Sequence, residues 1–343
     1  MHPLTMQRKI SPLSDLLSLF RLCRLLLRIR PALVHTHTPK AGLLGMIAGR
    51  LAGVPVRIYT INGLVWATHT GWSRRLLSAT ERLSCRLATD VLTVSESLRR
   101  TVIEQGICPE TKVRVLGWGG SHGVDLCRFD PAANVARGED VRKRLGIPAD
   151  AIVLIFIGRF VREKGIEELA HAWRGLRDEF PHARLLLCGW AEERDPVRAG
   201  VMAGLRECPR VVFSRGSPVE MPALYAAGDV CVLPSWREGL PNVALESAAM
   251  KLPIVATRIS GCVDAIHDGV TGLLVEPRDA ESLASGLRTV LKDAVMRRQM
   301  GENARRFVSE RFSEESVSGR LATEYRTLLG LAMPDTRTVP AKS

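Results

Sequence analysis

Short apolar runs alternate with segments of helical periodicity along most of this 343-residue chain, and this alternation restricts the fold more than any other feature. Such runs are typical of buried parallel strands. Strands that alternate with helices predict an α/β architecture. The runs lie at 33–37, 56–60, 91–95, 113–117, 152–158, 184–189, 210–213, 230–235, 253–257 and 272–277.

A polar stretch at residues 131–150 interrupts the alternation, and the pattern then starts again. The restart predicts two Rossmann-like, doubly wound domains that face a cleft, with ligand sites at the carboxyl ends of the strands. The expected segments are an N-terminal domain, a C-terminal domain, a terminal helix and a disordered tail, at 1–140, 148–312, 313–331 and 333–343.

The net charge of +12 is carried by the first part of the chain. Residues 1–147 hold 22 Lys and Arg against 10 Asp and Glu, whereas residues 148–343 hold 26 of each class. A basic domain of this kind is expected to face nucleic acid or an anionic membrane surface. Aromatic residues are only 5% of the chain and no zinc-finger or RNA-binding consensus occurs, which favours the membrane and no nucleic acid. A solvated basic face is the alternative.

A leucine-rich segment at residues 13–30 is predicted to be a helix with Arg21, Arg24 and Arg28 on one face. Such a helix either lies on a membrane surface or packs on the N-terminal sheet, and both hold if the basic edge faces the bilayer. No apolar run is long enough to span a membrane. The eight cysteines form no C-x-x-C pair, as is typical of a reducing cytoplasm. We therefore expect a cytoplasmic protein that associates peripherally with the inner face of the cell membrane.

The segment GRFVREKG, residues 158–165, follows an apolar strand and precedes a helix. Gly158 allows the backbone to come close to a ligand. Arg159 and Lys164, together with the helix N-terminus, could neutralise a diphosphate. A solvated basic loop is the alternative interpretation.

The segment WREGLPNVALESAAM, residues 236–250, places Glu238 and Glu246 eight positions apart around a Gly-Leu-Pro turn. Free N–H groups near Gly239–Val243 could hold a phosphate or a sugar hydroxyl. Carboxylates suit hydroxyl-bearing ligands, since each accepts hydrogen bonds from two adjacent hydroxyls. A glycoside-hydrolysing pair fits poorly beside a phosphate-binding loop. For either glutamate alone, a helix-end charge remains the alternative.

This spacing of two glutamates after Leu-Pro-Ser, with GRFVREKG earlier in the chain, resembles the donor half of family 4 glycosyltransferases, which have the GT-B fold. The resemblance covers nearly all of residues 33–330. HTHTPKAGLLG and REGLPNV are most similar to members that act on lipid-linked or polysaccharide acceptors in envelope synthesis. Further similar segments are VSESLRR (94–100), GVDLCRFDP (123–131), RISGCVDAIHDGVTGLLVEPRD (258–279) and RFSEESVSGRLATEYRTLL (311–329), the last resembling a helix that crosses back to the first domain.

The resemblance implies a hexosyltransferase that moves a hexose or N-acetylhexosamine from a UDP-linked or other nucleotide-diphosphate sugar, with retention of configuration and with no metal or other cofactor. The sequence contains no D-x-D pair, which agrees with the expectation that the enzyme needs no metal ion. Carried over by position, Arg159 and Lys164 hold the diphosphate, and Glu238 contacts hydroxyls of the donor sugar. Glu246 accepts hydrogen bonds from the ribose. The remaining donor-binding positions are Gly158, Gly239, Leu240, Pro241 and Asn242.

Two features depart from the family pattern. Family members begin with a strand and a glycine-rich loop, whereas MHPLTMQRKISP contains no glycine, so we expect an N-terminal domain that lacks its first strands. Asn62 stands where relatives commonly carry His, and an amide cannot take up a proton at neutral pH. Asn62 could still bind a sugar hydroxyl, or it could form an Asn-Gly turn.

Candidates for the acceptor side are His37, Lys40 and Asn62. We expect His35 and His37 to point to opposite sides of their strand, which argues against a metal pair. A helix cap is the simpler role for Thr38.

The leading interpretation is an enzyme that glycosylates an envelope polysaccharide or a lipid-linked acceptor. A donor-binding relative, catalytically impaired because it lacks the glycine loop, is the first alternative. A nucleotide-sugar epimerase shares the two-domain architecture but does not usually carry the two spaced glutamates. A nucleic-acid-binding protein has only the charge in its favour.

Overall fold

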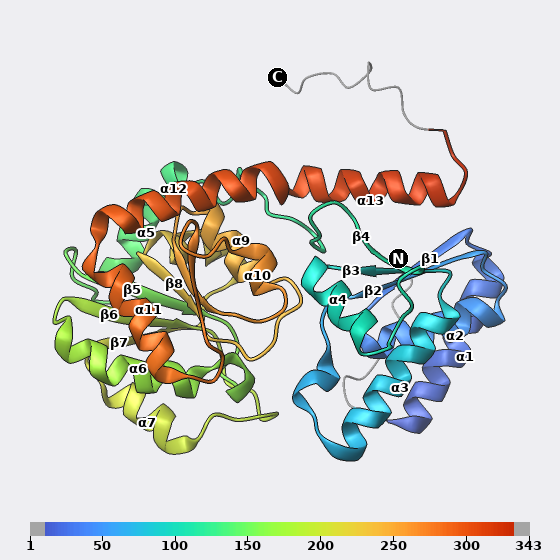
Figure 1. The fold of residues 1–343 in the computed structure, drawn as a ribbon, viewed down its shortest axis with the longest axis horizontal. Coiled ribbons are helices and arrows are strands. Elements are labelled where there is room, and N and C mark those ends of the chain that lie inside the picture. Colours follow the sequence, from blue (N-terminus) through green and yellow to red (C-terminus); the bar gives the residue numbers. More distant parts are fainter. Residues whose placement is uncertain (1–10, 333–343) are drawn as a thin grey trace. The chain divides into compact units, whose positions relative to one another are not determined.

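The computed structural model describes residues 11–332, so the tail predicted at 333–343 lies outside the described residues. The chain forms two compact units, each built on a parallel sheet (Figure 1). Unit 1 contains the residues up to Val94, Arg99–Gly117 and the residues from Ser316 onward, and unit 2 contains Ser95–Leu98 and Trp118–Glu315. The predicted architecture of two Rossmann-like α/β domains is confirmed.

Unit 1 has a four-stranded parallel sheet in the order β1-β2-β3-β4. Its strands are β1 (Leu33–His37), β2 (Val56–Ile61), β3 (Asp90–Thr93) and β4 (Val113–Val115). Its helical segments are α1 (Pro12–Ile29), α2 (Pro39–Leu51), η1 (Val65–Thr68), α3 (Gly71–Leu87), most of α4 (Glu96–Glu104) and most of α13 (Glu314–Leu328).

Helix α1 packs against α2, with Leu26 buried beside Ala48 and Val54. Arg21, Arg24 and Arg28 remain exposed on the other side. The predicted helix is therefore both packed on the unit and basic on its outer edge. None of the helices within residues 11–332 is both long and apolar enough to cross a bilayer.

The C-terminal helix α13 contacts strands of unit 1. The Tyr325 hydroxyl lies 2.6 Å from Nδ1 of His35 on β1, and Glu324 forms an ion pair with Arg114 on β4. Nε2 of His35 lies 2.6 Å from the Thr60 hydroxyl on β2. These polar contacts attach the end of the described chain to its first two strands and its fourth.

Unit 2 has a six-stranded parallel sheet in the order β10-β9-β8-β5-β6-β7. Its strands are β5 (Ile152–Ile157), β6 (Ala183–Cys188), β7 (Val211–Ser214), β8 (Val230–Leu233), β9 (Ile254–Thr257) and β10 (Gly272–Val275). Its helical segments are α5 (Pro131–Arg144), η2 (Arg162–Lys164), α6 (Ile166–Glu179), α7 (Ala199–Glu207), η3 (Pro218–Glu220), α8 (Met221–Ala226), α9 (Asn242–Ala249), α10 (Cys262–Ala265), α11 (Ala280–Lys292) and α12 (Ala294–Arg311).

Helices cover both faces of the unit 2 sheet, because successive strand residues point to opposite sides. On β5, Leu154 and Phe156 pack with α6, α7 and α11, whereas Val153 and Ile155 pack with α5, α8, α9 and α12. Strands buried on both faces are apolar throughout, which explains why the runs were recognisable in the sequence.

Helix α5 occupies most of the polar stretch at residues 131–150, where no helix was predicted from the sequence. The Asp130 side chain accepts a hydrogen bond from the Ala132 N–H at 3.0 Å, and Pro131 begins the helix. The helix packs against α8 through Gly138, which lies against the Ala226 backbone. Residues 118–140, assigned from the sequence to the first domain, therefore lie in unit 2.

The strand order places the loops that follow β5 and β8 next to each other. Strand β5 pairs with β6 on one side and with β8 on the other. The chain therefore adds β6 and β7 on one side of β5, and β8, β9 and β10 on the other, so the strand order reverses between β5 and β8. Ligands of open parallel sheets bind outside the carboxyl ends of strands at such a reversal. The two motif-bearing loops therefore begin where a ligand site is expected.

Candidate functional site

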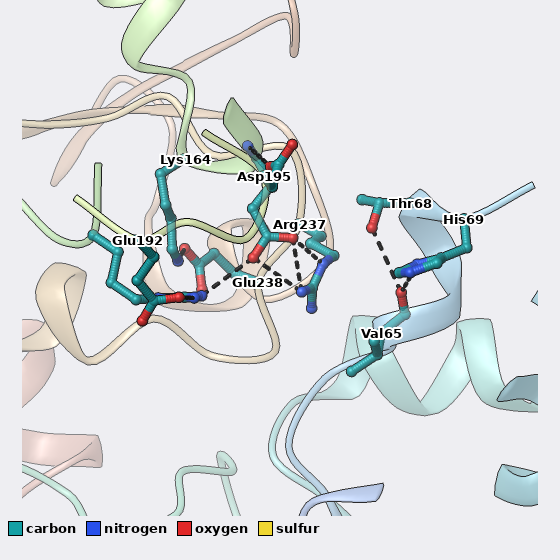
Figure 2. A network of polar contacts seen from close by, with 10 residues as sticks. Val65, Thr68, His69, Lys164, Glu192, Asp195, Arg237 and Glu238 are labelled. Carbon is teal, nitrogen blue, oxygen red and sulfur yellow. Dashed lines mark hydrogen bonds and ion pairs between the residues drawn. The ribbon is translucent and has the colours of Figure 1, made fainter. Parts of the chain in front are cut away.

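The loops after β5 and β8 are joined by direct contacts. Nζ of Lys164 forms an ion pair with the Glu238 carboxylate (Figure 2). The backbone N–H of Trp236 donates to the Glu163 carbonyl at 2.9 Å. Gly165 has a φ of 72° and lies against the Pro234 carbonyl, where a Cβ atom would overlap with it. Close approach and the left-handed backbone together require glycine at this position.

A third loop, after β6, supports the first one. The Phe160 N–H donates to the Trp190 carbonyl at 2.7 Å, and the Arg162 N–H donates to the Asp195 carbonyl at 3.0 Å. The Asp195 carboxylate accepts from the Glu163 N–H at 2.9 Å, which satisfies a donor at the start of η2. The backbone of GRFVREKG is thus held from both neighbouring loops.

Charged side chains of the three loops form a connected network. Arg159 donates from Nη1 to Glu192 at 2.7 Å and from Nη2 to Glu163 at 3.2 Å. Arg237 donates from Nε and Nη2 to the two oxygens of Glu163, each at 3.0 Å. Figure 2 shows the side chains of Glu192 and Arg237 converging on this region from the loops after β6 and β8.

Opposite charges in the network favour the ionised forms of Glu163 and Arg159. Burial raises the pKa of Glu163, but the guanidinium groups of Arg237 and Arg159 outweigh it and hold that pKa below its ordinary value. For Arg159, burial lowers the pKa, but Glu192 and Glu163 outweigh it and raise the pKa above its ordinary value. Arg159 and Lys164 both lie on the loop after β5, and each forms an ion pair with a glutamate. Such side chains can also donate to an anionic ligand.

The turn before α9 supplies backbone groups to the same region. Pro241 is the N-cap of α9, and Asn242 is the first helical residue. Gly239 is buried and lies close to Gly261, and Leu240 packs against the core. The first N–H groups of an α-helix have no partner within the helix, so they favour an anion or a hydroxyl.

Glu246 occupies a different environment from Glu238. Its carboxylate accepts a hydrogen bond from the buried Tyr225 hydroxyl at 2.8 Å. Burial raises the pKa of Glu246, against the opposing effects of the Tyr225 hydrogen bond and the charge of Arg128. The two glutamates thus have separate partners, Lys164 and Tyr225, and can contact different parts of one ligand.

The acceptor-side candidates lie in unit 1, after β1 and β2. Lys40 forms an ion pair with Asp15 at 2.5 Å, and Asn62 is exposed just after β2. The Asn-Gly turn, one of the two alternatives for Asn62, is not formed, because Gly63 has an extended φ of 158° and leads into η1. Thr38 occupies the N-cap of α2 but makes no side-chain capping hydrogen bond, contrary to the simpler expectation for it.

The prediction that His35 and His37 point apart was wrong. Their ring centroids are 4.2 Å apart, because residues two positions apart on a strand project to the same face. Within residues 11–332, no group of three or more His, Cys, Asp or Glu side chains is arranged to hold a metal ion.

The sequence interpretation missed Glu163, Glu192, Asp195 and Arg237 as parts of this network. Glu163 and Arg237 stand inside the quoted motifs, next to Lys164 and Glu238. This adjacency was the signal for Glu163 and Arg237, and the contacts of Glu192, Asp195 and Arg237 each join two different loops.

Comparison with known proteins identifies the family. Residues 138–307 match the group 1 glycosyl transferases, and residues 1–119 match a glycosyl transferase 4-like domain. The chain is 32% identical to the Staphylococcus aureus capsular polysaccharide biosynthesis glycosyltransferase CapM, over 96% of this chain and 85% of that protein.

Two further proteins are similar over most of the chain. The Escherichia coli UDP-Gal:alpha-D-GlcNAc-diphosphoundecaprenol alpha-1,3-galactosyltransferase is 28% identical, over 90% of this chain and 79% of that protein. The structure of sucrose-phosphate synthase from Thermosynechococcus elongatus superposes with a TM-score of 0.80 at 25% identity, over 94% of this chain and 81% of that one. The chain therefore belongs to the glycosyltransferases of the GT-B fold.

Proposed function

We propose that this protein transfers a hexose or an N-acetylhexosamine from a nucleotide-diphosphate sugar, most simply a UDP-sugar, to a polysaccharide or lipid-linked acceptor of the cell envelope. The observation that supports this proposal most directly is the position of Arg159, Lys164 and Glu238. All three lie on the loops that follow two adjacent strands, β5 and β8. Cations at that place can meet the diphosphate, and Glu238 can accept hydrogen bonds from sugar hydroxyls. The S. aureus and E. coli relatives, named for capsule synthesis and for a UDP-galactose donor, support the substrate class.

The chemistry requires stabilisation of the leaving nucleoside diphosphate. Negative charge grows on the diphosphate as the glycosidic bond breaks, and preorganised cations and N–H groups stabilise that charge without reorganisation. Arg159, Lys164 and the start of α9 are the groups proposed for this role. We propose that Glu246 accepts hydrogen bonds from the ribose.

The experiment measures nucleotide release and product formation with a panel of UDP-sugars and the lipid alpha-D-GlcNAc-diphosphoundecaprenol as a probe acceptor. The double variant Arg159→Ala, Lys164→Ala should lose transfer by at least about 1,000-fold, because several charge-assisted contacts to the diphosphate are removed. The matched control replaces Arg174 and Lys292, an exposed Arg and an exposed Lys of the same unit, and should keep normal turnover. Near-normal turnover in the first variant would rule out this assignment.

Retention of configuration and independence from metal ions are the finer parts of the proposal. NMR of the product should show the same anomeric configuration as in the donor. Activity should persist after removal of divalent cations with EDTA. Inversion, or an activity restored only by added Mg²⁺ or Mn²⁺, would contradict these two statements separately from the transfer itself.

We also propose that the basic surface of unit 1 brings the enzyme to anionic lipid at the inner face of the membrane. The exposed Arg21, Arg24 and Arg28 support this, as does the net charge of residues 1–147. Binding to vesicles that contain phosphatidylglycerol should weaken with salt and with the triple Arg→Gln variant. A control that replaces the exposed Arg174, Arg206 and Arg298 of unit 2 should bind normally. Binding that ignores salt would count against the proposal.

A donor-binding protein without transferase activity is the second candidate function, and Asn62, whose amide cannot take up a proton at neutral pH, motivates it. A protein of this kind would bind nucleotide sugars, but it would neither transfer the sugar to any acceptor nor hydrolyse the donor. His37, Lys40 and Asn62 remain the proposed acceptor-side residues. Asn62→His should raise turnover if Asn62 limits the reaction, and should leave it unchanged otherwise.

A further inference from the structure

Glu163 lies at the centre of the loop network, although the donor-site assignment gives it no role. Its side chain is only 16% exposed. Oε1 accepts from Nη2 of Arg159 at 3.2 Å and from Nη2 of Arg237 at 3.0 Å. The two guanidinium groups therefore share one oxygen atom, and their Nη2 atoms lie within about 6 Å of each other.

The backbone of Glu163 is fixed as well. Its N–H donates to the Asp195 carboxylate at 2.9 Å, and its carbonyl accepts from the Trp236 N–H at 2.9 Å. The residue is thus attached to the loops after β6 and β8. A side chain held in this way can keep its partners in one geometry before a ligand arrives.

Two guanidinium groups at this spacing repel each other unless a carboxylate lies between them. Arg237 meets Glu163 through two parallel N–H···O hydrogen bonds, which fix the plane of its guanidinium group. Arg159 is fixed by Glu163 at one nitrogen and by Glu192 at another. Both cations retain further N–H groups that can donate to an incoming anion.

We propose that Glu163 is a positioning residue that presents Arg159 and Arg237 as a pair to the donor diphosphate, and that Arg237 is a further donor-binding residue. This inference rests on the proposed function. A diphosphate carries oxygens on two phosphorus atoms, so each planar guanidinium group can donate to a different phosphate. The Arg237 side chain leaves the turn next to Glu238, the residue proposed to contact the donor sugar (Figure 2).

The test measures binding of UDP and of uridine to the full chain by calorimetry. Glu163→Gln keeps the size of the side chain but loses the charge that holds both arginines. It should weaken UDP binding about tenfold and leave uridine binding within about twofold, because only UDP has a diphosphate. Arg237→Gln should show the same selective loss, and the double variant should lose less than the product of the two single losses, because the part of the Glu163 effect that passes through Arg237 is already gone. Glu193→Gln, at an exposed carboxylate of the loop after β6, is the matched control and should resemble the wild type.

Three results would overturn the inference. Equal losses for UDP and uridine would mean that Glu163 only holds the loops together, and unchanged UDP binding would mean that it has no role. Tighter UDP binding would mean that Glu163 competes with the diphosphate for the arginines. If the wild type binds UDP, each of these outcomes leaves the proposed function standing. If the wild type binds no nucleoside diphosphate in a panel of UDP, GDP, ADP, CDP and dTDP, the proposed function fails and this inference falls with it.

Discussion

Two regions of the molecule shift the pKa values of their ionisable groups in opposite directions: the surroundings of Glu81 and His35 in unit 1, and the loop network of Glu163 and Arg159 in unit 2. In unit 1, the Tyr59 hydroxyl donates to buried Glu81 at 2.7 Å, and burial raises the pKa of Glu81 to about 7 despite that hydrogen bond. Burial, with the nearby His37, lowers the pKa of His35 to about 4. In unit 2, Glu163 and Arg159 remain charged, because each faces opposite charges.

The difference follows from the partners that each group has. A buried group with one neutral hydrogen-bond partner shifts toward its uncharged form, whereas a group between opposite charges keeps its ionised form. A neutral pair such as Tyr59 and Glu81 stabilises packing, but it carries no positive charge that could bind an anion. Ion pairs on partly exposed loops can exchange one partner for a ligand phosphate, as proposed for unit 2.

The largest effect is expected where the loop geometry of unit 2 is broken without removing any charge. Gly165→Ala places a Cβ atom against the Pro234 carbonyl at a left-handed position. We expect a loss of about 4 kcal/mol in the free energy of unfolding of unit 2 and loss of measurable UDP binding, because the loops after β5 and β8 must separate.

The matched control for this variant is Gly175→Ala, further along α6. That glycine is exposed, and no atom lies within 4 Å of a Cβ built on it. It should stabilise the protein by about 0.5–1 kcal/mol, as expected for alanine in a helix. Denaturant unfolding and a UDP titration test both variants. Normal UDP binding by Gly165→Ala would show that the contact between these loops is unimportant for the ligand.

Most of the fold was predictable from the sequence, since each predicted apolar run overlaps a strand. Runs such as IVLIFI are apolar because both faces of their strand are covered. Helix α5 was missed because its exposed face is strongly charged, as in Glu139, Lys143 and Arg144, and because only a few small or apolar residues such as Val141 are buried. The Asp130-Pro131 start was a helix signal that composition obscured.

The candidate site was predictable only in part. Arg159, Lys164 and Glu238 stood in motifs, but the pairing of Lys164 with Glu238 joins positions 74 residues apart. The network around Glu163 depends on three loops coming together, and loop geometry leaves no periodic pattern in the sequence. The error at His35 and His37 was of another kind, since the strand period of two was applied wrongly.

The raised pKa of Glu81 predicts that the stability of unit 1 depends on pH. The folded-state pKa of Glu81, about 7, lies above its ordinary value of 4.5, so the folded state binds more protons between these values and unit 1 loses stability as pH rises through this window. Glu81→Gln keeps an acceptor for Tyr59 but cannot ionise. At pH 8 the variant should be more stable than the wild type by on the order of 3 kcal/mol, with little difference at pH 5.

Denaturant unfolding at several pH values measures this effect. Glu104→Gln, which removes an exposed carboxylate from α4, is the control and should leave the pH dependence unchanged. A wild type whose stability does not fall between pH 5 and 8 relative to Glu81→Gln would mean that Glu81 is not held in its neutral form. The contrast between Glu81 and the charged Glu163 of the loop network would then not hold.

The smallest effect concerns the attachment of α13 to unit 1. Tyr325→Phe removes the hydroxyl beside Nδ1 of His35 and should cost about 1 kcal/mol, as for one net hydrogen bond. The folded-state pKa of His35, about 4, lies below its ordinary value of 6.5, so unit 1 loses stability as pH falls from 6.5 toward 4. A looser α13 exposes His35 to water, so its pKa should rise and the loss of stability on acidification should become smaller.

Histidine titration by NMR gives this pKa directly in both proteins. The control Arg326→Gln changes an exposed residue next to Tyr325 on α13 and should stay within about 0.5 kcal/mol of the wild type. If Tyr325→Phe loses stability but the His35 pKa stays near 4, then burial by the strands alone keeps the imidazole neutral. Helix α13 would in that case contribute a hydrogen bond to unit 1 but no exclusion of water from His35.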